Sequence, residues 1–95
     1  MNDYEVMVIV HPEADEEAVS AINEQVGQWV SAQGGELVKV DAWGRRKLAY
    51  AINKLTEGTY VVYEMRLPPT AVAEIDRGLR YHEQIVRYLI VRQND

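Results

Sequence analysis

Three consecutive basic residues, Arg45, Arg46 and Lys47, form the group of side chains in this sequence with the clearest chemical potential. Trp43 precedes them and Tyr50 follows, so cations alternate with aromatic rings. Such a segment suits phosphate contact by the cations and stacking of the rings on bases or sugars. The bases predicted to bind RNA are Arg45, Arg46, Lys47, Lys54, Arg80, Arg87 and Arg92. A charge run is usually a solvated surface, and bases on an edge strand also deter aggregation, so this alternative stays open.

Other chemistry finds little support among the remaining residues. His11 and His82 do not have the spacing of metal ligands, and the chain has no cysteine for a thiolate site or a disulfide. The acids of residues 13–17 are explained by a helix start, where carboxylates stabilise the N-terminus. The glycines do not form a phosphate-binding loop. We therefore expect no enzymatic activity, no metal, no cofactor and no small-molecule substrate.

Charge is distributed very unevenly along the 95 residues. Residues 1–36 contain eight acids and no Lys or Arg, whereas residues 37–95 contain all ten bases and seven acids. The net charge of −5 is therefore the sum of −8 and +3. The acidic total argues against strong binding to RNA by the chain alone, but a basic surface remains possible in its later part. The length and composition predict one globular domain, residues 1–95, without a targeting or membrane-spanning segment, in the cytoplasm.

The spacing of apolar residues predicts four strands and two helices. Asp15 is expected to cap the first helix, Gly34 and Gly35 to end it, and Thr70 to cap the second. Gly44 marks an expected bulge in a long strand. The predicted strands are 4–11, 37–52, 60–67 and 85–92, with a turn over 53–58 between the second and third.

This order of elements predicts an α+β fold of the ferredoxin-like split βαβ type, βαββαβ. In that fold both helices cover one face of a four-stranded antiparallel sheet and the other face is open. Alternation along the strands places an apolar patch on the open face, and such patches usually bind a partner. The residues predicted to bind a partner protein are Met7, Ile9, Tyr60, Val62, Leu89 and Val91.

Several segments resemble the bacterial small-subunit ribosomal protein S-six family. They are Tyr4-Glu5-Val6 with His11-Pro12, the stretch DAWGRRKLAYAINKL over residues 41–55, Gly58-Thr59-Tyr60, and RYLIV over residues 87–91. The resemblance implies a ferredoxin-like fold, no catalysis and a place in the platform of the small ribosomal subunit. It also implies two partners, the central domain of small-subunit ribosomal RNA and ribosomal protein S-eighteen.

Two other functions stay open at the level of sequence. An RRM-like module outside the ribosome would bind single-stranded RNA on the open sheet, where Tyr60 is an aromatic residue on a central strand. The paired RNP signatures are absent, however, and the neighbours of Tyr60 are aliphatic, which favours a protein contact. A regulatory domain for small molecules shares the same fold, but no convergent polar site supports it.

Overall fold

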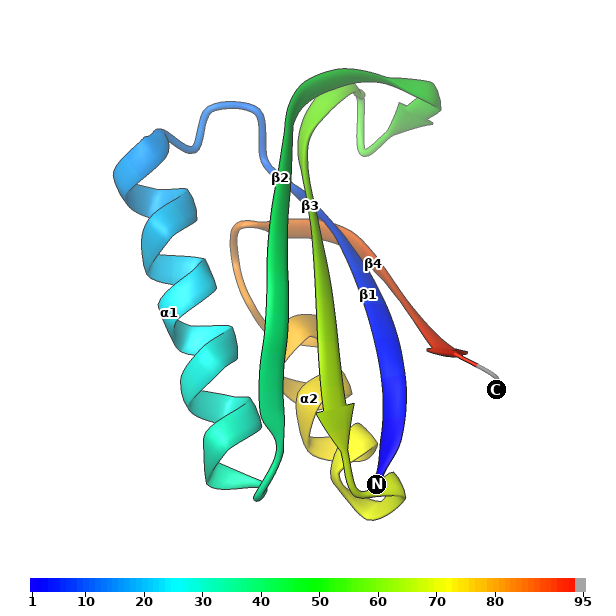
Figure 1. Ribbon diagram of the computed structural model, residues 1–95. Coiled ribbons are helices and arrows are strands. Elements are labelled where there is room, and N and C mark those ends of the chain that lie inside the picture. Colours follow the sequence, from blue (N-terminus) through cyan, green and yellow to red (C-terminus); the bar gives the residue numbers. More distant parts are fainter. Residues whose placement is uncertain (94–95) are drawn as a thin grey trace.

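The computed structural model describes residues 1–93, which form a four-stranded antiparallel sheet with helices on one face (Figure 1). The sheet order is β2-β3-β1-β4, so β1 and β3 are central. This arrangement confirms the predicted βαββαβ fold. The elements are β1 (Asn2–Val10), α1 (Glu16–Ala32), β2 (Glu36–Ile52), β3 (Leu55–Leu67), a 3₁₀ helix (Pro69–Ala71), α2 (Val72–Arg80) and β4 (Ile85–Gln93).

The hydrophobic core lies between the sheet and the two helices. Strand alternation sends every second side chain of β1 and β3 toward the helices. The helices contribute apolar residues at spacings of three and four, which line one face of each. The fully buried members include Val6, Val8 and Val10 of β1, Val61 and Tyr63 of β3, Ile22, Val26 and Val30 of α1, and Ile75 and Leu79 of α2. Neither helix has the length and apolar character needed to cross a bilayer within the described residues.

Both ends of α1 are formed by local signals that the sequence predicts. The Asp15 carboxylate accepts a hydrogen bond from the backbone N–H of Ala18 at 2.8 Å, which caps the first turn. At the other end Gly34 adopts a φ of 76°, and the N–H of Gly35 donates to the carbonyl of Val30 at 2.9 Å. The left-handed conformation at Gly34 and this backward hydrogen bond terminate the helix.

The start of α2 differs from the prediction, because Thr70 does not cap it. Thr70 lies inside the 3₁₀ helix, and α2 begins at Val72 without a side-chain cap. Pro69 has no N–H to satisfy at the first position. The N–H of Ala71 donates to the carbonyl of Pro68 at 2.9 Å. The backbone therefore closes this turn by itself.

The turn between β2 and β3 is shorter than the predicted segment 53–58. Only Asn53 and Lys54 form it, with φ values of 50° and 67°. A two-residue turn with positive φ at both positions matches the right-handed twist of the flanking strands. Pairing consequently continues to Leu55, and residues 55–58 belong to β3.

The helices meet where Gly78 of α2 faces the indole of Trp29 in α1. A Cβ added to Gly78 would lie 2.9 Å from the nearest ring atom. Tyr63, beneath α1, donates its hydroxyl to Asn23 Oδ1 at 2.6 Å, and burial raises the pKa of this tyrosine. The tyrosine hydrogen bond thus joins α1 to β3, and the small side of Gly78 lets α2 pack closely against α1.

We predict that Gly78→Ala lowers the free energy of unfolding by about 1 kcal/mol, because overpacking of the new methyl group against Trp29 outweighs the gain in helix propensity. Gly27→Ala in α1 is the matched control, since its Cβ would lie 3.6 Å from Leu37, an ordinary contact. This control gains helix propensity and should stabilise the chain by up to about 1 kcal/mol. Urea unfolding measures both values, and an equal response of the two variants would contradict the packing argument.

Candidate nucleic-acid and partner interface

Strands β2 and β3 extend past the rest of the sheet as a long hairpin. Its end, residues 46–54, is called the hairpin tip below. The tip bends toward the sheet face that carries no helix, here called the open face (Figure 1). Within residues 1–93 no ion pair involves Arg46, Lys47 or Lys54, and all three are exposed. The tip therefore offers free positive charge to a partner.

A β-bulge at Trp43 orients the aromatic side of this hairpin. The β2–β3 register shifts between Ala42 and Gly44, and Gly44 has a φ of 82°. The Trp43 ring lies parallel to that of Tyr60, with 6° between the planes and 6.4 Å between centroids. The Arg46 guanidinium lies 5.1 Å from the centroid of the Trp43 ring, in cation–π contact. The bulge expected at Gly44 thus builds a layer of two aromatic rings and one cation on the open face.

Arg45 is directed away from this layer, although it neighbours Arg46 in the sequence. It lies opposite Thr59 in the register and forms an ion pair with Glu57 at 3.3 Å. Its guanidinium also donates to the carbonyl oxygen of Pro12. Arg45 therefore ties the hairpin to the loop between β1 and α1.

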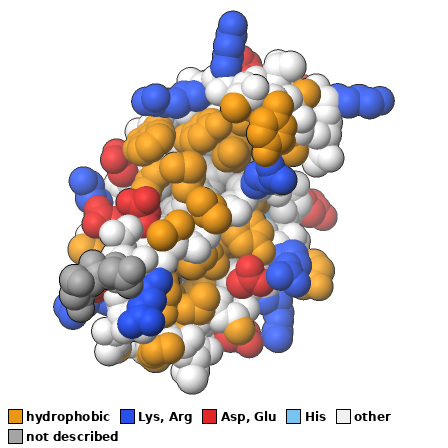
Figure 2. Space-filling view, turned by 90° about the vertical axis from the view of Figure 1, so that its right-hand side faces the viewer, with side chains coloured by type: hydrophobic (Ala, Val, Ile, Leu, Met, Phe, Trp, Pro, Cys, Tyr) orange, Lys and Arg blue, Asp and Glu red, His pale blue; other side chains and the backbone are white. Residues whose placement is uncertain are grey.

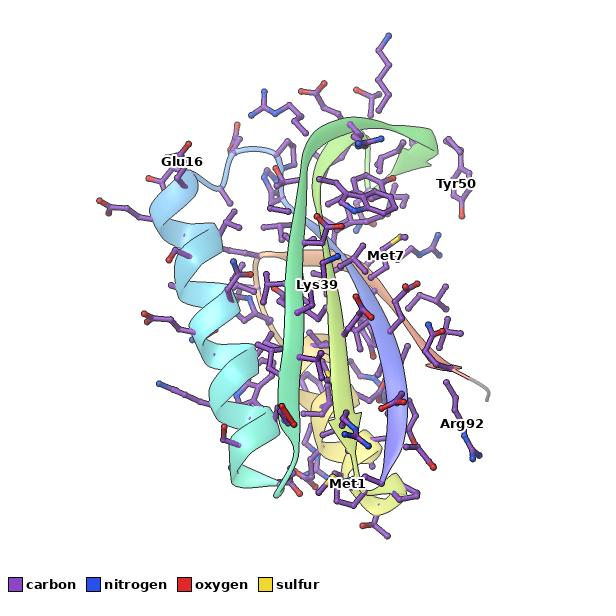
Figure 3. The ribbon with its side chains drawn as sticks, viewed as in Figure 1. Met1, Met7, Glu16, Lys39, Tyr50 and Arg92 are labelled. Atoms are coloured by element: carbon purple, nitrogen blue, oxygen red, sulfur yellow. The ribbon has the colours of Figure 1, made fainter. Side chains whose placement is uncertain are left out.

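Arg87 of β4 contacts the hairpin tip across the open face. Its Nη1 donates to the hydroxyl of Tyr50 at 2.6 Å, and its guanidinium carbon lies 5.9 Å from the centroid of that ring. Figure 3 shows Tyr50 at the end of the hairpin, on the same side of the sheet as Met7. This contact joins segments 37 residues apart in the chain.

The predicted partner residues do lie together on the open face. Met7 is paired with Val62 on one side and with Leu89 on the other. Ile9 is paired with Tyr60 in the next row along the strands. Apolar side chains occupy the middle of this face in Figure 2, with basic side chains projecting above them.

Exposure within this apolar patch is graded from one side to the other. Leu89 is 60% exposed and Val91 43%, whereas Ile9 is 9% exposed and Val62 only 6%. A hollow of about 330 Å³ at the exposed side is lined by Met7, Ile9, Arg87, Tyr88 and Leu89. Other parts of the chain thus cover the open face around Ile9 and Val62, and its β4 side is the part free for a partner.

Carboxylates lie beside the apolar patch on the same face. Glu5 of β1 is directly opposite Glu64 of β3, one row from the Met7–Val62 pair. Lys39 lies across from Glu64 on β2, but within residues 1–93 neither glutamate forms an ion pair. Like charges at directly opposed positions of a sheet are unfavourable. A cationic group from outside the chain would relieve this repulsion.

The two histidines have structural hydrogen bonds. His11 Nδ1 accepts from the N–H of Glu13 at 3.2 Å, and His82 Nδ1 accepts from that of Gln84 at 3.2 Å. His82 Nε2 also lies 2.8 Å from Gln25 Oε1. Within the described residues, no three acidic, histidine or cysteine side chains gather in a way that would hold a metal ion.

Comparison with known proteins places this fold in a family. The family model described as ribosomal protein S6 matches residues 3–92. The small ribosomal subunit protein bS6 of Desulforamulus reducens is 44% identical over 95 residues, and the alignment covers all of both chains. The relative of the same name from Clostridioides difficile is 45% identical over 91 residues, which is 96% of this chain and 98% of that one. The chain belongs to the ribosomal protein S6 family.

A solved structure from the ribosomal protein S6 family supports the same assignment. The crystal structure of 30S ribosomal protein S6 from Thermotoga maritima matches with a TM-score of 0.91 and 31% identity. The match covers 97% of this chain and 87% of that one. The relatives of this chain are proteins of the small ribosomal subunit and not enzymes. This confirms the expectation of a non-catalytic protein in the cytoplasmic ribosome.

Within this S6-family fold the seven predicted RNA-binding bases do not form one surface. Arg80 is on α2, where its Nη2 lies 2.8 Å from Asp76 Oδ2. The Tyr88 hydroxyl donates to the other oxygen of Asp76 at 2.6 Å, and partial burial and this bond raise the pKa of Tyr88. Arg92 lies opposite Tyr4 on the helix-bearing face, about 17 Å along β4 from Arg87. Among residues 1–93, only Arg46, Lys47 and Lys54 are cations at the tip without an ion pair.

Sequence reasoning did not identify Tyr50 as the contact of Arg87 or Trp43 as the partner of Tyr60. The signal for Trp43 was present, because a glycine with positive φ inside a strand indicates a bulge that redirects its neighbour. No local signal indicates the Tyr50–Arg87 contact, since it depends on the direction in which the hairpin bends.

We predict that Gly44→Ala lowers the free energy of unfolding by about 1 to 2 kcal/mol, because a side chain resists the left-handed conformation. No heavy atom lies within 4 Å of the added Cβ, so the cost comes from the backbone alone. Gly44→Asn should cost less, since Asn tolerates this region better than Ala. Chemical denaturation measures both, and equal losses would exclude the backbone explanation.

Proposed function

We propose that this S6-family protein binds the central domain of small-subunit ribosomal RNA together with ribosomal protein S-eighteen in the platform of the subunit. The observation that carries the proposal is the division of one side of the molecule into two adjoining parts. The hairpin tip carries free cations, and the open face carries an apolar patch beside carboxylates. The first suits phosphate and the second suits a protein with basic residues.

The hairpin tip supports the RNA contact through its charge and its rings. Arg46, Lys47 and Lys54 are exposed and unpaired within residues 1–93, so they are available for phosphates. Trp43, 40% exposed and next to Arg46, offers a ring edge or face to a base or sugar. Arg45 contributes indirectly, because it holds the hairpin against the loop after β1.

The open face supports the protein contact through its exposed apolar side chains. Leu89 and Val91 on β4 stand next to Met7 and the opposed pair Glu5–Glu64. A partner with an apolar segment and nearby basic residues would bury the first and neutralise the second. Such a partner would also supply the positive charge that a chain of net charge −5 lacks for binding RNA.

We predict that Arg46→Gln and Lys47→Gln each weaken binding of the S-eighteen complex to a central-domain RNA fragment by about three- to tenfold at moderate salt. Each should reduce the slope of log affinity against log salt by about 1, because one phosphate contact is lost. Arg77→Gln is the control, since Arg77 pairs with Glu74 on α2 at 3.4 Å. Filter-binding titrations at several salt concentrations test this, and an equal effect of Arg77→Gln would refute a tip-specific contact.

We predict opposite effects of Glu5→Gln on stability and on partner binding. Removing one of two opposed carboxylates should raise the free energy of unfolding by about 0.2 to 1 kcal/mol. The same change should weaken binding of ribosomal protein S-eighteen several-fold, most strongly at low salt. Glu24→Gln, an exposed change of equal charge on α1, should leave the affinity unchanged. Calorimetric titration measures affinity, and an unchanged value for Glu5→Gln would remove this face from the partner site.

A further inference from the structure

The contact between Tyr50 and Arg87 connects the two parts of the proposed interface. Tyr50 lies in the hairpin tip, between Lys47 and Lys54 in the sequence. Arg87 lines the apolar hollow on the open face together with Met7 and Leu89. The RNA-contacting segment and the partner-contacting surface therefore share one hydrogen-bonded pair, at 2.6 Å.

Packing at the base of the tip keeps the hairpin close to the open face. A Cβ added to Gly58 would lie 2.5 Å from Ile9 Cγ2 and 3.9 Å from a methyl carbon of Leu48. Only a glycine permits this approach of the hairpin to β1. Ile9 is 9% exposed although no helix covers its face. The bend of the hairpin is therefore part of the packed structure, and the tip beyond it is held by Tyr50 and Arg87.

We propose that the Tyr50–Arg87 pair is a latch that fixes the hairpin tip over the open face and couples partner binding to RNA binding. The inference rests on the proposed function and adds a physical link between its two partners. The pair is exposed in the free chain, where water competes for both groups. A partner that fills the hollow beside Arg87 excludes this water and strengthens the hydrogen bond.

A strengthened latch holds Arg46, Lys47 and Lys54 in one arrangement before RNA arrives. Binding of RNA then costs less conformational entropy of the tip, which appears as positive cooperativity. The coupling must be reciprocal, so RNA on the tip raises the affinity for the partner by the same factor. The latch thus adds a coupling through the chain itself to the positive charge that the partner supplies for RNA.

Four variants and two controls test the latch. Tyr50→Phe removes the hydroxyl and keeps the ring, Arg87→Gln removes the donor cation, and the double variant removes both. Gly58→Val pushes the hairpin from Ile9 and opens the tip by a different route. Tyr81→Phe and Arg77→Gln match the first two changes at exposed positions of the α2 region. Because Tyr50 and Arg87 are on the surface, their variants should fold normally.

Two measurements on the full chain decide the question. Backbone order parameters for residues 47–53 of the free chain should fall in Tyr50→Phe and Arg87→Gln and stay unchanged in both controls. The coupling factor is the ratio of RNA affinities with and without ribosomal protein S-eighteen. It should fall about three- to tenfold in each single variant, and no further in the double variant, because both changes break one interaction.

The contrary results separate a failure of the latch from a failure of the proposed function. Unchanged order parameters in Tyr50→Phe would show that the pair does not hold the tip. Additive losses in the double variant would show that the two residues act separately. If Arg87→Gln lowered RNA affinity without the partner while Tyr50→Phe did not, Arg87 would be a direct RNA contact. If the wild-type chain bound RNA equally well with and without the partner, the proposed function would fail, and the order parameters would still report on the latch itself.

Discussion

Val6 of β1 lies opposite Tyr63 of β3, and Met7 lies opposite Val62. The rest of the structure depends on this register, because alternation sends the first pair into the core and the second to the open face. A slip of one residue would exchange the two sets and expose the side chains that α1 and α2 now cover. Burial of each large apolar side chain stabilises the fold by about 1.5 to 3 kcal/mol, so the core sets the register. The open face is a consequence of that choice.

The helices cover one face of the sheet, and the hairpin covers part of the open face. The hairpin covers its upper part, which leaves Ile9 almost buried, while Leu89 at the β4 side stays 60% exposed. The bulge at Gly44 and the close approach at Gly58 determine how far this cover extends. The basic tip and the free apolar surface are consequently adjacent, as the proposed joint complex with RNA and a basic protein would need.

Most of the fold follows from local patterns, and the exceptions have identifiable causes. The order of elements, the Asp15 cap, the helix end at Gly34 and the bulge at Gly44 were predictable because each has a short-range signal. Thr70 was a wrong prediction, since a proline next to it lets the backbone close its own turn. The turn after β2 was predicted too long, because positive φ at Asn53 and Lys54 allows pairing to continue to the turn itself.

Sequence alone determined which residues share a face and how charge divides along the chain, since both depend only on strand period and residue type. It grouped Met7, Val62 and Leu89 correctly for that reason. Asp76 lies only four residues before Arg80 on α2, so that pair follows from helix spacing alone. The tertiary structure decided which other cations are held: the Pro12 carbonyl accepts from Arg45, and the Tyr50 hydroxyl accepts from Arg87. These partners come from distant segments, and their meeting depends on the path and bend of one hairpin. Local periodicity carries no information about such distances.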